Sequence, residues 1–387
     1  MSKNIIFCAD GTWNGPGDDG DGLIGRTNVY KLYANLDGAP AAGETLAEQE
    51  RSVTNGGGKQ IQIAKYLHGV GNSDNALVRL LGGAVGTGLI ARIVRGYTFI
   101  SRNYLAGDRI YIAGFSRGAY TARALAGLIS ARGLLDATSI DLTDRERAYR
   151  LGLAIWWGYR RQVNAHGGIL GTLRGVIDGV AEGLLDFATS KLITHVPIEA
   201  IAVWDTVGEL GIPIYDHGAT LDVFRFTNNR LPAAVRTGIH AVAIDEERET
   251  FTPTLWDDDP RVTQVLFSGA HSDIGGGYPE DGLSDIAYVW MADRLVALGV
   301  LTATMPSYVP DPKPRDMAHC PWASAPWPDL GVARRTFPAN IRVKASVCER
   351  EAAPNVPVQG LAPTKYAPGN ADCFSSGFPL DATLIEP

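Results

Sequence analysis

The sequence has no excess of basic residues. Its 35 Lys and Arg stand against 42 Asp and Glu, which gives a formal net charge of −7 at pH 7. A nucleic-acid-binding protein needs a basic surface to neutralise phosphates, so we expect no nucleic acid partner. The same charge gives no general attraction to an anionic membrane and leaves only peripheral membrane contact through a local patch open.

Long apolar runs are also missing. No stretch reaches the roughly 18 consecutive apolar residues that a membrane-spanning helix needs. The N-terminal "MSKNIIFCADGTWNG" has an apolar run that is too short for a signal peptide and leads straight into a turn. We therefore expect a cytoplasmic protein, with secretion by a route that needs no cleaved signal left open.

Cysteine is scarce. The four cysteines are Cys8, Cys320, Cys348 and Cys373, and none forms a C-x-x-C pair or a zinc-binding spacing. We expect free buried thiols, in keeping with a reducing compartment, and no bound metal. "GTGLIA" has the spelling of a dinucleotide-binding loop, but no strand leads into it and no acidic residue ends a later strand at the required distance. We therefore expect no cofactor.

The 387 residues, 45% of them hydrophobic, are enough for one large α/β domain over residues 1–387. Apolar segments such as "NIIFCA", "DRIYIAGF" and "IEAIAVW" read as buried strands, and they alternate with segments of helical periodicity. This alternation predicts a mostly parallel sheet with helices on both faces. In such sheets the active groups lie at the carboxyl ends of the strands.

One strand end carries the stretch "AGFSRGAY", in which Gly114, Ser116 and Gly118 have the spacing G-x-S-x-G. A strand, a tight turn and a helix of small residues is the setting that exposes a nucleophilic serine. The alternative is a plain structural turn. A nucleophilic serine needs a base to take its proton, an acid to orient that base, and an oxyanion hole.

Candidates for the acid and the base follow later strands. Asp205 ends the apolar run "AIAVW", with Asp10 and Asp273 as rival acids. His271 follows "VTQVLFSGA" in a glycine-rich loop, with His68 as the second choice. The chain order serine, aspartate, histidine is the order found in α/β-hydrolases.

The oxyanion hole of that fold uses the N–H of the residue after the nucleophile and a second N–H from a loop after an earlier strand. The first donor would be Arg117, and the second Gly11 or Thr12 in "ADGTWN". A simple glycine turn is the alternative reading of that loop. The Arg117 side chain has two candidate partners, Asp10 and a substrate phosphate.

Residues 137–197 read as an inserted helical cap or lid. Trp156, Trp157 and Tyr159 lie beside two arginines, a combination that suits a lipid–water interface, so we expect them to bind substrate. Ordinary packing of an inserted helical pair is the alternative.

Five segments together resemble one family. In order from Asp10 to Tyr278, "FCADGTWN", "GFSRGAYTARALAGLI", "VWDTVG", "AIDEERETFTPTLW" and "GAHSDIGGGY" are similar to the type VI secretion phospholipase effector-like family. The resemblance implies an α/β-hydrolase core, a triad of Ser116, Asp205 and His271, and lipid or other ester substrates. We therefore expect a serine esterase or lipase. An inactive hydrolase-fold binding protein and a metal-assisted hydrolase are the alternatives, and the oligomeric state is not predicted.

Overall fold

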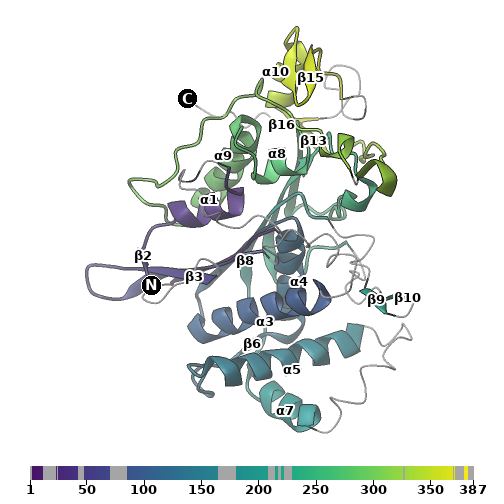
Figure 1. Ribbon diagram of the computed structural model, residues 1–387. Coiled ribbons are helices and arrows are strands. Elements are labelled where there is room, and N and C mark those ends of the chain that lie inside the picture. Colours follow the sequence, from purple (N-terminus) through teal and green to yellow (C-terminus); the bar gives the residue numbers. More distant parts are fainter. Residues whose placement is uncertain are drawn as a thin grey trace.

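The computed structural model describes residues 2–11, 23, 25–41, 48–69, 85–163, 180–207, 214–216, 219–221, 229–325, 327–368, 370 and 379–381. In this part of the chain, ten strands form one sheet in the order β16-β13-β12-β11-β8-β5-β1-β4-β3-β2 (Figure 1). Neighbouring strands from β16 to β4 are parallel, whereas β3 pairs antiparallel with both β4 and β2. The predicted mostly parallel α/β sheet is confirmed.

The strands of the sheet are β1 (Asn4–Ala9), β2 (Ala39–Pro40), β3 (Glu48–Thr54), β4 (Gln60–Leu67), β5 (Arg109–Phe115), β8 (Ile198–Trp204), β11 (Val235–Ala243), β12 (Val262–Phe267), β13 (Arg342–Lys344) and β16 (Leu380–Asp381). Three short pairs lie outside it: β6 (Leu134–Leu135) with β7 (Leu192–Ile193), β9 (Ile214–Asp216) with β10 (Ala219–Leu221), and β14 (Val356–Val358) with β15 (Leu361–Thr364).

The helices are α1 (Asn28–Asn35), α3 (Val85–Asn103), α4 (Arg117–Arg132), α5 (Arg145–Val163), α7 (Val180–Thr189), α8 (His271–Gly275), α9 (Gly282–Ala297) and α10 (Ala345–Ala352). Within the described residues, short 3-10 helices lie in the loops: η2 (Glu249–Phe251), η3 (Pro321–Ala323) and η4 (Trp327–Leu330). None of the helices in the described ranges is long and apolar enough to cross a bilayer.

Strand β1 shows why its residues form a continuous apolar run. Ile5 and Phe7 face the core that also contains residues of α3 and α4, whereas Ile6 and Cys8 face the core that contains residues of α1 and α9. A strand covered on both faces must be apolar at every position rather than at alternate ones. Helices therefore cover both faces of the sheet, as the alternation of strands and helices predicted.

The predicted insertion, residues 137–197, contains α5 and α7. Helix α5 packs on α3, α4 and α7. In the view of Figure 1 it lies below α3 and α4, and α7 lies below it. The antiparallel pair β6–β7 ties the two ends of this segment together. Residues 164–179 are outside the described part of the chain, so the predicted lid over the site stays a prediction.

The expectation that every cysteine is a free thiol is wrong. Cys8 and Cys320 are free, but Cys348 is disulfide-bonded. Cys373 lies outside the described residues. The prediction failed because spacing along the chain reveals motifs such as C-x-x-C, whereas a disulfide depends on the distance between residues in the folded chain. The cysteines therefore no longer support a reducing compartment.

Candidate active site

Ser116 lies at the turn from β5 into α4. Its backbone has φ 57° and ψ −123°. Residues other than glycine rarely adopt this conformation, which costs about 1–3 kcal/mol. The neighbouring glycines allow the turn, because a Cβ on Gly114 would lie 2.4 Å from the Gly118 oxygen, and one on Gly118 would lie 2.0 Å from the Ala9 oxygen. The predicted strand, tight turn and helix around Ser116 are confirmed.

Asp205 follows the last residue of β8, as predicted. It is fully buried with φ 37°, and its Oδ1 accepts a hydrogen bond of 3.0 Å from the Ala243 N–H at the end of β11. Its Oδ2 lies 2.5 Å from Nδ1 of His271. The structure therefore brings together two of the residues that the sequence proposed for the triad.

His271 begins α8, and three residues separate it from the end of β12. One of them, Gly269, has φ 116° and turns the chain. The imidazole packs between Phe115, with ring centroids 4.6 Å apart, and Phe251, with centroids 5.0 Å apart. Its Nε2 is buried and has no hydrogen-bond partner in the part of the chain that the structure describes. The imidazole therefore lies on the ring of the residue before Ser116, and the Ser116 N–H donates to the oxygen of Trp204, the residue before Asp205. Nδ1 faces the acid, so Nε2 is the nitrogen that remains for a nucleophile.

The protonation states fit an acid and a base. Burial alone would raise the pKa of Asp205, but the charge of Arg335 and the hydrogen bond from His271 overcome it and hold that pKa well below its usual range. Burial lowers the pKa of the His271 imidazole, against the opposing effect of Asp205. At neutral pH the pair is therefore an ionised carboxylate beside a neutral imidazole.

Arg335, which the sequence did not single out, binds the acid directly. Its Nη1 lies 2.7 Å from Asp205 Oδ1, and its Nη2 lies 3.0 Å from Oδ2. The same guanidinium donates to the carbonyl oxygens of Ala243 and Phe251. Arg335 lies in an irregular, proline-rich segment, where no pattern separates a buried arginine from a solvated one.

Glu246 was also missed. It accepts a hydrogen bond of 3.2 Å from the His271 N–H, and its carboxylate pairs with Arg248 at 2.7 Å. The Arg248 guanidinium lies over the Phe251 ring, 3.6 Å from the centroid. These contacts hold the first residue of α8 and the Phe251 ring that packs on the imidazole. The signal for Glu246 in the sequence is the acidic segment "IDEERE", where several charged residues follow the apolar end of β11.

The rival acids bind other groups. Asp10 accepts hydrogen bonds from Thr27 and Tyr66, each at 2.6 Å. Asp273 accepts from the backbone and the ring of His319, with Nδ1 at 2.6 Å. Among the described contacts, the His271 ring is bound by the Asp205 carboxylate and not by Asp10 or Asp273.

His68, the second candidate for the base, follows β4 and is half-buried. Its Nδ1 contacts the carbonyl oxygen of the next residue, Gly69. No carboxylate orients this ring among the contacts of the described residues. The geometry therefore favours His271 as the base.

The predicted oxyanion donors have different surroundings. The N–H of Arg117 is in the first turn of α4, where N–H groups have no acceptor within the helix. The N–H of Gly11 donates to Asp10 Oδ1 at 2.7 Å, which argues against Gly11 as the second donor. Thr12 lies outside the described residues.

The aromatic residues of α5 behave as core residues. Trp156 is 2% exposed and packs with Tyr159, while Trp157 and Tyr159 are partly buried against the same core. This burial argues against the predicted contact of Trp156 with substrate. The alternative reading, packing of an inserted helical pair, describes these residues better.

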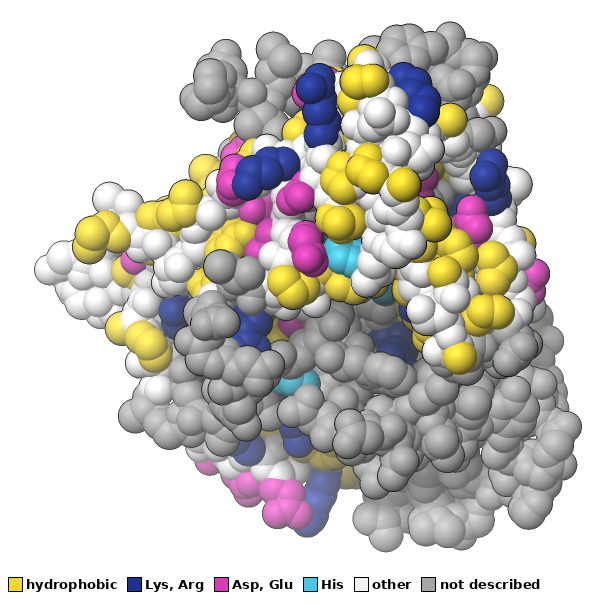
Figure 2. Space-filling model, turned by 45° about the horizontal axis from the view of Figure 1, so that its top comes forward, with side chains coloured by type: hydrophobic (Ala, Val, Ile, Leu, Met, Phe, Trp, Pro, Cys, Tyr) yellow, Lys and Arg dark blue, Asp and Glu magenta, His cyan; other side chains and the backbone are white. Residues whose placement is uncertain are grey.

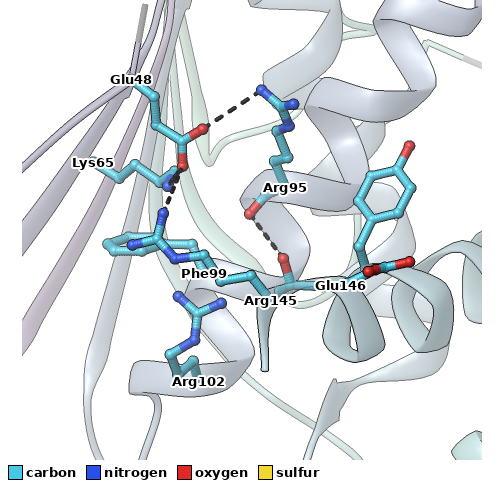
Figure 3. Close-up of a pocket in the computed structure, with 9 residues that line it drawn as sticks. Glu48, Lys65, Arg95, Phe99, Arg102, Arg145 and Glu146 are labelled. Carbon is cyan, nitrogen blue, oxygen red and sulfur yellow. Dashed lines mark hydrogen bonds and ion pairs between the residues drawn. The ribbon is translucent and has the colours of Figure 1, made fainter. Parts of the chain in front are cut away.

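A separate charged pocket of about 290 Å³ lies between β3, β4, α3 and α5 (Figure 3). Its charges pair with one another: Glu48 contacts Lys65, Arg95 and Arg145. None of the predicted site residues lines it.

On the face shown in Figure 2, hydrophobic side chains lie among basic and acidic ones. Across the described ranges, no three His, Cys, Asp or Glu side chains converge as metal ligands would.

Comparisons with known proteins place the chain in a family. An uncharacterized protein of Saccharomyces cerevisiae is 34% identical over 133 residues, which are 34% of this chain and 18% of that protein. Two solved structures are similar: an uncharacterized protein from Pseudomonas aeruginosa, with 18% identity and a TM-score of 0.40 over 78% of this chain and 46% of that one, and the Tle1 effector bound to the VgrG spike of the type 6 secretion system, with 19% identity and a TM-score of 0.39 over 72% and 51%.

This chain therefore spans about a fifth of the curated relative and about half of each solved chain. The family model for the catalytic domain of Tle1-like phospholipase effectors matches residues 3–294. That range covers most of the chain and includes Ser116, Asp205 and His271. The chain belongs to the Tle1-like phospholipase effector family of the type VI secretion system, through its catalytic domain.

Proposed function

We propose that this chain is a serine hydrolase that cleaves carboxylic esters, with lipid or phospholipid acyl esters as substrates. The single observation that carries the proposal is the buried pair of Asp205 and His271, whose imidazole packs on Phe115, the residue before the strained Ser116. Membership of a phospholipase effector family supports the lipid substrate.

In the proposed reaction, Ser116 Oγ attacks the ester carbonyl carbon while its proton passes to Nε2 of His271. The Arg117 N–H stabilises the resulting oxyanion, together with an N–H of the loop that contains Thr12. The tetrahedral intermediate collapses, and the leaving alkoxide takes the proton from Nε2. This step leaves the acyl group on Ser116.

A water molecule then enters, and the same histidine takes its proton. The hydroxide attacks the acyl carbon, Ser116 regains its proton from Nε2, and the carboxylic acid leaves. Asp205 keeps Nδ1–H of His271 oriented and stabilises the imidazolium in both halves of the reaction. No cofactor is needed, because every proton goes to or comes from His271.

The test measures fatty-acid release from a panel of acyl esters and phospholipids by the full chain and by Ser116→Ala. We expect activity in the full chain, its loss in the variant, and labelling of Ser116 by a fluorophosphonate probe. Activity that survives Ser116→Ala would refute the mechanism. A chain that neither hydrolyses nor labels would instead be a binding protein, and loss of activity on chelation would favour a metal-assisted reaction.

A further inference from the structure

The residue after the proposed nucleophile, Arg117, is partly buried, and one nitrogen of its charged side chain lacks a hydrogen-bond partner among the described residues. This nitrogen, Nη1, is inaccessible to solvent and makes no hydrogen bond with any group in the described ranges. Buried charged groups are normally paired, and one without a partner calls for an explanation. Burial is also the main reason that the pKa of Arg117 falls to about 9, with the charge of Arg92 adding to the effect.

The carboxylate at the end of β1 does not neutralise it. Asp10 accepts hydrogen bonds on Oδ1 from Gly11 and on Oδ2 from Thr27 and Tyr66. The sequence offered this carboxylate as one of two partners for Arg117, and the contacts of the structure leave the other partner, a phosphate. A second guanidinium, that of Arg92, donates to the Asp10 carbonyl oxygen at 2.5 Å.

Arg92 lies on the side of the serine away from the base, and it is close enough to Arg117 for the two charges to act on each other. The acid follows β8 and the base follows β12, which are on the same side of β5 in the strand order. Arg92 contacts the ends of β1 and β4, on the other side of β5. A substrate with its carbonyl at Ser116 therefore has the base on one side and the Arg92 guanidinium on the other.

We propose that Arg117, supported by Arg92, forms a subsite for a fixed anionic group of the substrate, a phosphate ester next to the scissile acyl ester. The inference rests on the proposed function, because it places the phosphate relative to an ester bound at Ser116. A fixed phosphate is favoured over the transient oxyanion, since the oxyanion is served by the Arg117 N–H, whereas the guanidinium is at the far end of a long side chain. Planar guanidinium groups suit phosphate oxygens.

The test compares two monomeric substrates that share their acyl chains, dihexanoylglycerol and dihexanoylglycerol phosphate. For Arg117→Gln we expect kcat/KM to fall about 10- to 100-fold on the phosphate ester and less than about threefold on the neutral ester. Arg117→Lys should recover part of the loss. Arg132→Gln, at the other end of α4 and bound to the Gly158 oxygen, is the matched control and should lose nothing on either substrate.

Inorganic phosphate separates the two sources of the anion. Competitive inhibition of neutral-ester hydrolysis that Arg117→Gln abolishes would show that free phosphate fills the subsite. Selectivity without such inhibition would show that the phosphate binds only as part of the lipid. Both results support the subsite.

Equal losses on both substrates, or none on either, would overturn the proposal. A variant that fails to react with a neutral fluorophosphonate would show damage to the nucleophile and would also count against a purely binding role. Failure of Ser116→Ala to stop hydrolysis is a separate result, since it refutes the proposed function whatever Arg117 does.

Discussion

Replacing Arg335 with glutamine removes two charged hydrogen bonds from Asp205, at 2.7 and 3.0 Å. The carboxylate stays fully buried, with the Ala243 N–H and His271 as its remaining described donors. Removing one partner of a buried ion pair costs about 3–5 kcal/mol, because the other charge is left uncompensated. We expect Arg335→Gln to lower the free energy of unfolding at pH 7 by about that amount in urea denaturation.

The loss should depend on pH. Burial alone would raise the pKa of Asp205, and Arg335 is the largest of the influences that lower it below the ordinary value of 3.8. A carboxyl group whose pKa is lowered by folding contributes stability above its unfolded pKa and loses it as the pH falls through the folded pKa. The stability difference between the natural protein and Arg335→Gln should therefore be full at pH 7 and shrink below about pH 4.

Activity gives a second measurement. Without Arg335, the negative charge of Asp205 acts on His271 with less compensation, so the pKa of the imidazole rises. The acid limb of the pH profile of kcat/KM should move to higher pH. Arg334→Gln is the matched control: Arg334 is exposed and pairs with Glu247 at 3.3 Å, and its loss should change the unfolding free energy by less than about 0.5 kcal/mol.

The reasoning would be refuted if Arg335→Gln and Arg334→Gln lowered the free energy of unfolding equally. It would also be refuted if the acid limb of kcat/KM had the same midpoint in Arg335→Gln as in the natural protein. A loss of stability that did not depend on pH would refute the electrostatic part alone. It would assign the role of Arg335 to its hydrogen bonds with the two carbonyl oxygens.

Four further predictions concern other features of the site and the fold. Ser116→Gly and Ser116→Ala should both abolish hydrolysis. Because glycine adopts φ 57° without strain, the free energy of unfolding in urea should be about 1 kcal/mol higher for the glycine variant than for the alanine variant, and equal values would contradict this. The acid limb of kcat/KM should have its midpoint below pH 6.5, since burial lowers the pKa of His271, and a higher midpoint would argue against that residue as the base. Gly118→Ala should prevent folding, as judged by circular dichroism, since its Cβ would lie 2.0 Å from a backbone oxygen of β1, whereas Gly183→Ala on α7 meets open space and should be neutral or stabilising. Cys348→Ser should lower the melting temperature of the oxidised protein but not of the reduced one, and an unchanged value in both would mean that the disulfide does not form.

The sequence was sufficient for features that are recorded locally along the chain. Strand β8 is apolar from Ala200 to Trp204, so its carboxyl end is visible as the next polar residue, Asp205. The glycines around Ser116 are visible because only glycine permits the close approach of strand and helix there. These signals need no knowledge of which strands are neighbours.

Features that depend on distant segments could not be predicted in this way. Arg335 contacts Asp205 across 130 positions of the chain, and nothing near it in sequence marks it as buried. Trp156 illustrates the reverse error, because aromatic and basic neighbours suggested a lipid interface while packing on α3 and α4 buries the indole. The disulfide of Cys348 belongs to the same class of features, since it too is set by proximity in space.

The acid of the proposed triad is held by a side chain from outside the range that defines the family. The family model covers residues 3–294, and Arg335 lies beyond it. A newly sequenced member recognised through that range alone would inherit an expected nucleophile, acid and base, but not the cation that sets the charge of its acid. In this chain, the segment after the matched region therefore supplies the charge that holds the Asp205 carboxylate ionised.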